Sequence, residues 1–219
     1  MLFSEKVRRE SNDWWERSFK HPFIKQLVDG SLPAETFRYY LIQDHYYLKH
    51  FSKIHQLVGE QSDDVEIKKL MFASAEGLAQ SESAIRDDFF KELNITDEEI
   101  EQTGIAPTAY HYVSHMYRQL AEFNPEAAFS GLLPCAWLYL EIGYKLIGKG
   151  SPNPMYQRWI ETYSTDEFKE SVDNQRRSLD RVAKESSQET VEAMANAFKI
   201  SSIEEYNFWG MALDHQTWE

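Results

Sequence analysis

Residues 33–59 read PAETFRYYLIQDHYYLKHFSKIHQLVG, and this stretch decides the fold class. It opens with proline, closes with glycine, and repeats apolar residues at intervals of three and four, which is typical of an amphipathic helix. The stretch therefore predicts one long helix. Its expected buried face consists of Phe37, Tyr40, Leu41, Tyr47, Leu48, Phe51, His55 and Val58.

The same spacing continues on both sides of this stretch, and no segment alternates strictly between apolar and polar residues, so no strand is predicted. Prolines, glycines and capping residues mark the helix ends. No repeat or linker divides the chain, which predicts an all-α, single-domain helical bundle over residues 1–219. Besides 33–59, we expect helices over 4–20, 22–29, 64–93, from 107, from 124, 155–163, 164–183 and from 186, with a capped turn at 96–99 and a loop at 148–154.

Composition excludes several classes of function. The chain has 219 residues with 23 Lys and Arg against 36 Asp and Glu, a net charge of −13 that disfavours binding to nucleic acid. Its longest uncharged run, residues 127–140, contains a proline and is shorter than the roughly 20 residues that span a bilayer. The single cysteine, Cys135, cannot form an internal disulfide, and no signal-like segment opens the sequence. These features predict a cytoplasmic protein with no nucleic-acid or membrane partner.

Two polar side chains fall in the middle of expected buried faces. Asp44 lies at the centre of the 33–59 face, either as a structural carboxylate satisfied by a tyrosine hydroxyl or a helix end, or as a recognition group for a polar ligand. Cys135 lies among apolar residues of the expected helix that begins at 124, where an inert buried thiol is the common case. Pro134, however, should kink or restart that helix, which could place Cys135 near a helix N-terminus that favours a thiolate.

A third polar side chain, Glu205, lies on the apolar stripe of the last helical stretch, while its neighbour Glu204 is expected to point elsewhere as an ordinary polar residue. A thiol and two carboxylates on three core faces, each flanked by aromatic residues, are suited to nucleophilic and acid/base catalysis in an aromatic pocket. The stripe that carries Glu205 consists of Val191, Met194, Phe198, Phe208, Trp209 and Ala212.

Metal and cofactor motifs are missing from the sequence. His111 and His115 have the i, i+4 spacing of a ligand pair, but no carboxylate partner is identifiable, so we interpret them as surface or core histidines. The sequence contains no Glu-x-x-His pair, Gly-x-Gly-x-x-Gly, phosphate loop or Cys-x-x-Cys. It therefore predicts neither a metal nor another cofactor.

Short segments throughout the chain together resemble the TenA family of aminopyrimidine aminohydrolases, also called thiaminase II, whose fold is a haem-oxygenase-like helical bundle. None of the histidines at 21, 45, 50 and 55 stands out as a haem ligand. The segments that carry the resemblance are WWE at 14–16, HPF at 21–23, QDHYY at 43–47, PTAYHY at 107–112, SHMY at 114–117, LPCAWLY at 133–139, WIETY at 159–163, SS at 201–202 and EYNFWG at 205–210.

The resemblance implies a role for each candidate residue. Cys135 corresponds to the nucleophile, Glu205 to the acid/base, and Asp44 to a carboxylate that binds the pyrimidine. The walls of the substrate pocket would be formed by Tyr47, Tyr112, Tyr139, Tyr163 and Phe208.

The expected reactions are hydrolysis of 4-amino-5-aminomethyl-2-methylpyrimidine to the 5-hydroxymethyl compound with release of ammonia, and cleavage of thiamin into hydroxymethylpyrimidine and thiazole. Both belong to thiamin salvage or degradation. The resemblance also suggests a homotetramer. The alternative is a non-catalytic pyrimidine-binding or regulatory helical protein.

Overall fold

The computed structural model describes the backbone of residues 1–219 and all side chains except those of Glu82, Ser83, Arg86, Asp87 and Ile147. Throughout the described backbone the regular elements are helices, which confirms the predicted all-α single domain. In chain order they are α1 (Phe3–Glu10), α2 (Asn12–Phe19), α3 (Pro22–Asp29), α4 (Ala34–Gln61), α5 (Val65–Ile85), the π-helical turn η1 (Arg86–Phe90), α6 (Lys91–Leu93), α7 (Asp97–Thr103), α8 (Pro107–Glu122), α9 (Pro125–Ile147), α10 (Pro154–Thr162), α11 (Asp166–Glu185) and α12 (Gln188–Asp214).

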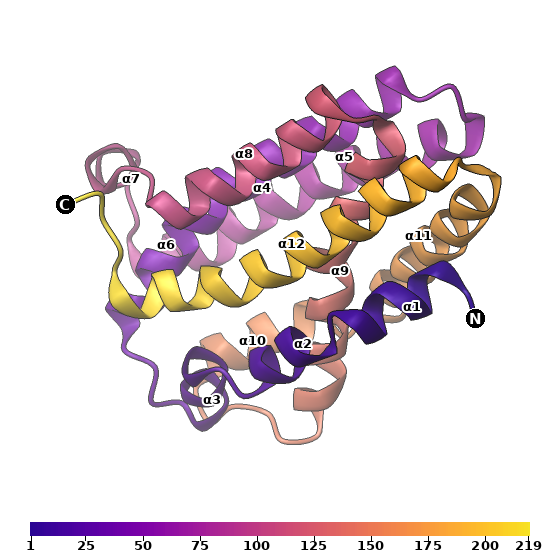
Figure 1. The fold of residues 1–219 in the computed structure, drawn as a ribbon. Coiled ribbons are helices and arrows are strands. Elements are labelled where there is room, and N and C mark those ends of the chain that lie inside the picture. The colour runs from indigo at the N-terminus through magenta and orange to yellow at the C-terminus, as the bar shows by residue number, and fades with distance from the viewer.

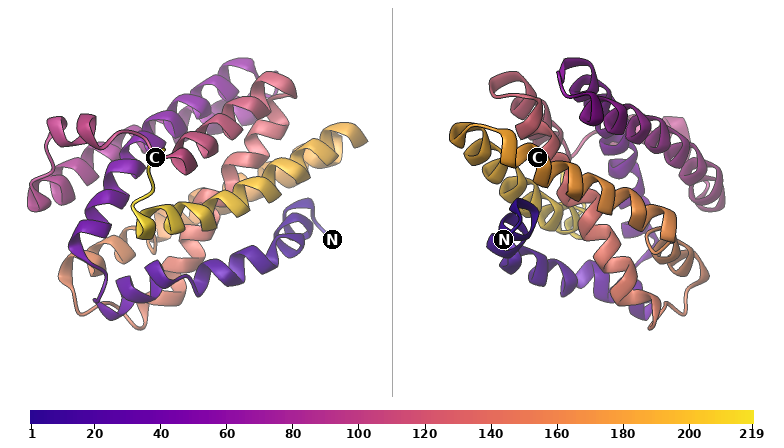
Figure 2. Two further views of the ribbon diagram at one scale, coloured as in Figure 1. Left: turned by 60° about the vertical axis from the view of Figure 1, so that its left-hand side comes forward. Right: turned by 90° about the vertical axis from the view of Figure 1, so that its right-hand side faces the viewer.

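Four helices form the centre of the domain. Each of α4, α8, α9 and α12 packs against the other three, and α9 crosses behind α12 (Figure 1). The remaining helices cover this group: α5 lies on α4, α11 lies on α9, and the N-terminal helices α1 and α2 run along α12 (Figure 2). The core of the bundle is strongly aromatic, and its largest fully buried side chains include Trp15, Tyr40, Phe198 and Trp209.

Several helix ends differ from the predicted positions. The expected helix over 4–20 breaks at Ser11 into α1 and α2, and both halves bury apolar residues, Val7 before the break and Trp15 after it. The apolar spacing therefore continues across a backbone break. The N-caps of α11 and α12 are Thr165 and Ser187, each one residue later than expected. In both cases the preceding serine donates its hydroxyl to a backbone carbonyl of the helix before it. One of the two adjacent residues therefore caps the end of one helix, and the other caps the start of the next.

Of the two alternatives predicted for Pro134, a kink or a restart of the helix, the restart is wrong. The helix α9 begins at Pro125, capped by the Asn124 side chain, and continues through Pro134 to residue 147. Packing against three other long helices holds the backbone in place although one internal hydrogen bond is missing. Cys135 therefore lies in the middle of a helix and receives no help from a helix N-terminus. Within the described residues, no helix is both long and apolar enough to cross a membrane.

Candidate active site

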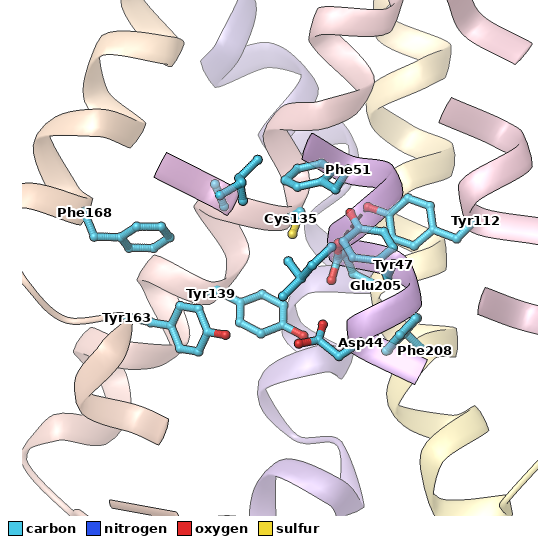
Figure 3. Close-up of a pocket in the computed structure, with 13 residues that line it drawn as sticks. Asp44, Tyr47, Phe51, Tyr112, Cys135, Tyr139, Tyr163, Phe168, Glu205 and Phe208 are labelled. Atoms are coloured by element: carbon cyan, nitrogen blue, oxygen red, sulfur yellow. Dashed lines mark hydrogen bonds between the residues drawn. The ribbon is translucent and has the colours of Figure 1, made fainter. Parts of the chain in front are cut away.

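A cavity opens between the long helices at the level of Cys135 (Figure 3). It contains about 510 Å³ of space unfilled by atoms, its opening to solvent included. All eight side chains selected from the sequence line it, together with apolar side chains toward α5 and α11. The complete lining is Asp44, Tyr47, Leu48, Phe51, Leu78, Tyr112, Cys135, Ala136, Tyr139, Tyr163, Phe168, Glu205 and Phe208.

Helical periodicity explains why residues scattered along the sequence meet here. On α4, Asp44, Tyr47 and Phe51 follow one another at three- and four-residue steps, so they share one face of the helix. The same rule pairs Cys135 with Tyr139 on α9, and Glu205 with a phenylalanine one turn later on α12. Because α4, α9 and α12 pack on one another, these three faces converge.

Glu205 is held as a buried carboxylic acid. Only 2% of its surface is exposed, and the Tyr112 hydroxyl donates to its Oε1 at 2.6 Å. Burial raises the pKa of Glu205 from an ordinary 4.5 to about 8, while hydrogen bonds from Tyr112 and Cys135 act in the opposite direction. The side chain is therefore largely protonated at neutral pH and can donate a proton.

Cys135 rests as a thiol. Burial raises the pKa of its thiol well above the usual range, and the neighbouring Glu205 raises it further. The thiol lies within hydrogen-bonding reach of the Glu205 carboxyl group. A thiolate at this position can therefore form only when a neighbouring group accepts its proton.

Asp44 occupies a different part of the cavity, where Figure 3 shows its carboxyl group facing the ring of Tyr139 at the hydroxyl end. It is 7% exposed, and its charge contributes to the raised pKa of Tyr139 and, as the largest contribution after burial, of Tyr163. The Tyr139 hydroxyl also lies 3.1 Å from that of Tyr40, which stands behind it in the core. A carboxylate and tyrosine hydroxyls thus form a second polar part of the cavity, in addition to Cys135 and Glu205.

Tyr47 presents a hydroxyl that is available to a ligand. The residue is 3% exposed, and its hydroxyl lies near the Tyr112 hydroxyl and the Cys135 thiol without a hydrogen bond of ordinary geometry to any described residue. Its ring packs on Tyr112 at 4.9 Å and against Phe208 at 5.7 Å between centroids. A buried polar group left without a partner is costly, so a ligand that binds this hydroxyl would gain affinity.

A glycine on α9 brings Tyr163 into the cavity wall. A Cβ atom at Gly143 would lie 2.7 Å from the carbonyl oxygen of Tyr163 and 2.9 Å from its carbonyl carbon. Only glycine allows the backbone that follows α10 to approach α9 this closely. The ring of Tyr163 then packs on Tyr139 at 4.8 Å and on Trp159 at 5.0 Å between centroids.

The expectation that Glu204 is an ordinary polar residue is wrong. It is 6% exposed, and its Oε1 lies 3.1 Å from Nδ1 of His111. A single apolar stripe could not reveal this, because α12 packs against helices on several sides and is buried over more than one face. The second histidine of the i, i+4 pair, His115, is buried near the Ala197 carbonyl and Gln119. Neither histidine is part of a metal-binding cluster among the described residues.

Comparison with known proteins gives first the fold class and then the family. The chain shares its fold with a domain of unknown function from Shewanella denitrificans OS217 that has a heme oxygenase-like fold, with a TM-score of 0.75, 17% identity, and coverage of 96% of this chain and 91% of that one. Residues 8–215 match the TENA/THI-4/PQQC family, and the chain belongs to this family.

Two relatives show how far the similarity extends. An aminopyrimidine aminohydrolase from Bacillus subtilis strain 168 is 41% identical over 218 residues, which cover 100% of this chain and 92% of that protein. A TenA homologue from P. horikoshii OT3 is 26% identical with a TM-score of 0.87, and the alignment covers 98% of this chain and 100% of that chain. The family resemblance and the haem-oxygenase-like fold predicted from the sequence are both confirmed.

Proposed function

We propose that this protein is an aminopyrimidine aminohydrolase, with 4-amino-5-aminomethyl-2-methylpyrimidine as a substrate and the 5-hydroxymethyl pyrimidine and ammonia as products. The observation that carries the proposal is the convergence of a thiol, a protonated carboxylic acid and a second carboxylate in one aromatic cavity. The 41% identity to the Bacillus subtilis enzyme of that name over the whole chain supports the same substrate class.

The cavity suits a flat, polar heteroaromatic ring. The rings of Tyr47, Tyr139 and Phe208 offer aromatic faces on which a pyrimidine can pack. Asp44, in the second polar part of the cavity, accepts hydrogen bonds from the amino group, and a carboxylate acceptor makes such bonds stronger than neutral ones. The Tyr47 hydroxyl, which makes no hydrogen bond of ordinary geometry to the described residues, supplies a further hydrogen-bonding group.

The chemistry begins with addition of Cys135. Direct displacement at the aminomethyl carbon is slow, whereas addition of sulfur to the adjacent ring carbon breaks the aromaticity and prepares the amine to leave. Because Glu205 starts protonated and Cys135 starts as a thiol, we infer that Glu205 is the donor of the first proton that is transferred. Glu205 donates it to a ring nitrogen and takes up the thiol proton as the S–C bond forms.

The later steps restore the enzyme. The exocyclic C–N bond breaks, and the nitrogen leaves as ammonia after receiving a proton from Glu205. Water then adds to the exocyclic carbon and gives up a proton to Glu205. The S–C bond breaks as the ring becomes aromatic again, while Glu205 protonates the departing Cys135 sulfur and takes back the proton of the ring nitrogen. Cys135 is thus a covalent nucleophile, and Glu205 moves every proton. With thiamin as substrate, the thiazole would be the leaving group in place of ammonia.

Assembly and location follow the family resemblance and the composition. We propose a homotetramer working in the cytoplasm, where a lone, unpaired cysteine such as Cys135 remains reduced. Light scattering at micromolar concentration measures the assembly directly. A monomer at that concentration contradicts the tetramer without affecting the proposed reaction.

The deciding experiment is an assay of the purified protein with the aminomethyl pyrimidine, in which ammonia and the hydroxymethyl product are measured together. We expect the two products in equal amounts. Calorimetric titration with the hydroxymethyl pyrimidine is the companion measurement. Tight binding without turnover would contradict an enzyme and support the alternative, a pyrimidine-binding or regulatory protein.

A further inference from the structure

Two neighbouring residues on α8 face two neighbouring residues on α12. His111 Nδ1 lies 3.1 Å from Glu204 Oε1, and one residue further along both helices the Tyr112 hydroxyl donates to Glu205 Oε1 at 2.6 Å. The two helices pack side by side (Figure 1). The pair outside the cavity is therefore connected to the acid inside it by one peptide step on each helix.

Glu204 and His111 differ sharply in exposure. The side chain of Glu204 is 8% exposed, whereas that of His111 is 68% exposed. Burial raises the pKa of Glu204, while His111 and the side chain of Asn207 act to lower it. When Glu204 is ionised, the proton of the hydrogen bond lies on Nδ1, because a carboxylate can only accept. The pair links a buried charge beside the cavity to a histidine in contact with solvent.

Packing alone gives no reason for a carboxylate at position 204. An apolar residue of similar size would fill the site without the cost of burying a charge, and such replacements are often neutral for stability. Its charge acts in the same direction as burial, raising the pKa of Glu205.

The other groups that face Glu205 offer no positive charge. From α4 come Asp44 and Tyr47, from α8 Tyr112, from α9 Cys135 and Tyr139, and from the end of α10 Tyr163. Among the described residues that line the cavity, none is a lysine or an arginine. Asp44 raises the pKa of Glu205 more than Glu204 does, but it lies in the cavity itself. The Glu204–His111 pair is a second titratable group beside Glu205, and it connects the acid to solvent through the exposed His111.

We propose that Glu204 and His111 form a positioning pair for Glu205, which holds α12 in register with α8 so that Glu205 meets the Tyr112 hydroxyl and which sets the charge beside that acid. The inference rests on the proposed function for its catalytic consequence. The predicted effect on the protonation of Glu205 can be measured without turnover.

The charge is tested with Glu204→Gln, which keeps the size and a hydrogen-bond acceptor. The protonated carboxyl band of Glu205 is followed by infrared spectroscopy as a function of pH and is assigned by its loss in Glu205→Gln. Because a like charge favours the neutral acid, its removal should lower the midpoint of the band by about half a pH unit or more. Glu192→Gln, at an exposed position of the same helix, is the matched control and should leave the midpoint unchanged.

The register is tested with two variants of His111. His111→Asn keeps an N–H donor near the place of Nδ1 and should retain kcat within about twofold, whereas His111→Leu removes the donor and should lower kcat about tenfold with little change in KM. A midpoint in Glu204→Gln equal to that of the parent and the control overturns the pair's influence on Glu205, whatever the turnover. Equal kcat in the two His111 variants overturns the positioning role. Absence of turnover in the parent instead contradicts the proposed function and leaves the infrared test in force.

Discussion

Two neighbouring regions of the α9–α12 interface differ in the surroundings of their buried polar groups. In the first, the Trp15 indole donates to Ser202 Oγ at 3.0 Å, Ser202 donates to the Phe198 carbonyl at 2.9 Å, and Ser130 donates to the Met194 carbonyl at 2.8 Å. These three side chains each have a partner inside the protein, whereas the hydroxyl of the adjacent Ser201 is buried without one of ordinary geometry among the described residues. In the second, one turn further along, the polar groups face a cavity.

In the second region the polar groups are not fully satisfied by the protein's own hydrogen bonds. The Tyr47 hydroxyl is buried with only the Tyr112 hydroxyl and the Cys135 thiol near it. Glu205 carries a proton that its ordinary pKa would not allow it to keep, and Cys135 is a thiol beside that acid. Polar groups that hold a fold together are satisfied by the fold, whereas groups that bind and transform a ligand are left with unused hydrogen-bonding capacity or a shifted pKa. The comparison predicts that substitutions in the two regions separate activity from stability.

The largest effect is expected for Cys135→Ser. Turnover at saturating substrate should fall by about a thousandfold or more, because a serine hydroxyl is far less ionised and less nucleophilic than a thiol. The free energy of unfolding should change by less than about 1 kcal/mol, since a hydroxyl facing the cavity can bond to Glu205 or to water. Steady-state kinetics and a melting curve on the same preparation measure both. A stable variant with turnover within about tenfold of the parent would show that Cys135 has a structural role and is not the nucleophile.

Asp44→Ala should weaken substrate binding by about 10- to 100-fold, because it removes the charge-assisted hydrogen bonds proposed for the amino group. Turnover should fall as well, since a misplaced ring cannot meet Cys135. Calorimetric titration with the hydroxymethyl pyrimidine separates the binding loss from the kinetic loss. Unchanged affinity would instead support the interpretation of Asp44 as a structural carboxylate.

Glu205 should make stability depend on pH. Its pKa is about 8 in the folded protein against an ordinary 4.5, so its contribution to stability is complete below pH 4.5 and is lost as pH rises through about 8. Glu205→Gln removes this dependence and should be more stable than the parent above pH 8, by roughly 5 kcal/mol. Urea unfolding of both proteins between pH 5 and 9 checks the sign, and parallel pH curves would show that Glu205 titrates normally. Activity should fall over the same rise in pH, because the acid loses its proton.

A smaller loss of activity is expected for Gly143→Ala. The added Cβ would meet the Tyr163 backbone at 2.7 Å, so Tyr163 must shift and its ring must leave its place in the cavity wall. We expect KM to rise about three- to tenfold. Gly77→Ala on α5 is the matched control, because a Cβ there meets no atom within 4 Å and should leave kinetics unchanged. Similar kinetics in both variants would show that the position of Tyr163 does not matter.

The smallest effect on activity is expected in the first region. Ser202→Ala leaves the buried Trp15 indole N–H without its acceptor and should destabilise the protein by about 1 to 3 kcal/mol. The folded fraction should keep the kinetic constants of the parent. Thermal denaturation and kinetics at a temperature well below the midpoint provide the two readouts. A large fall in turnover in the fully folded variant would break the distinction between the two regions.

The sequence by itself determined the helical class and most helix positions, because three- and four-residue apolar spacing and capping residues act locally. It also identified Asp44, Cys135 and Glu205, since a polar residue in the middle of an apolar stripe is visible without coordinates. The break at Ser11 and the uninterrupted helix through Pro134 were beyond it, because packing between distant segments decided both.

Only the tertiary structure decided what surrounds each polar group. The sequence predicted that Glu204 points away from the apolar stripe as an ordinary polar residue, because a stripe analysis assumes one buried side. The helix α12 is instead enclosed on several sides and buries Glu204 against His111. It also left open whether Cys135 is an inert buried thiol or lies near a helix N-terminus that favours a thiolate, whereas the fold buries the thiol beside a carboxylic acid and raises its pKa. Helix formation depends on neighbours along the chain, but the pKa of a side chain depends on every charge and solvent molecule within a few ångströms, and those are set by the fold.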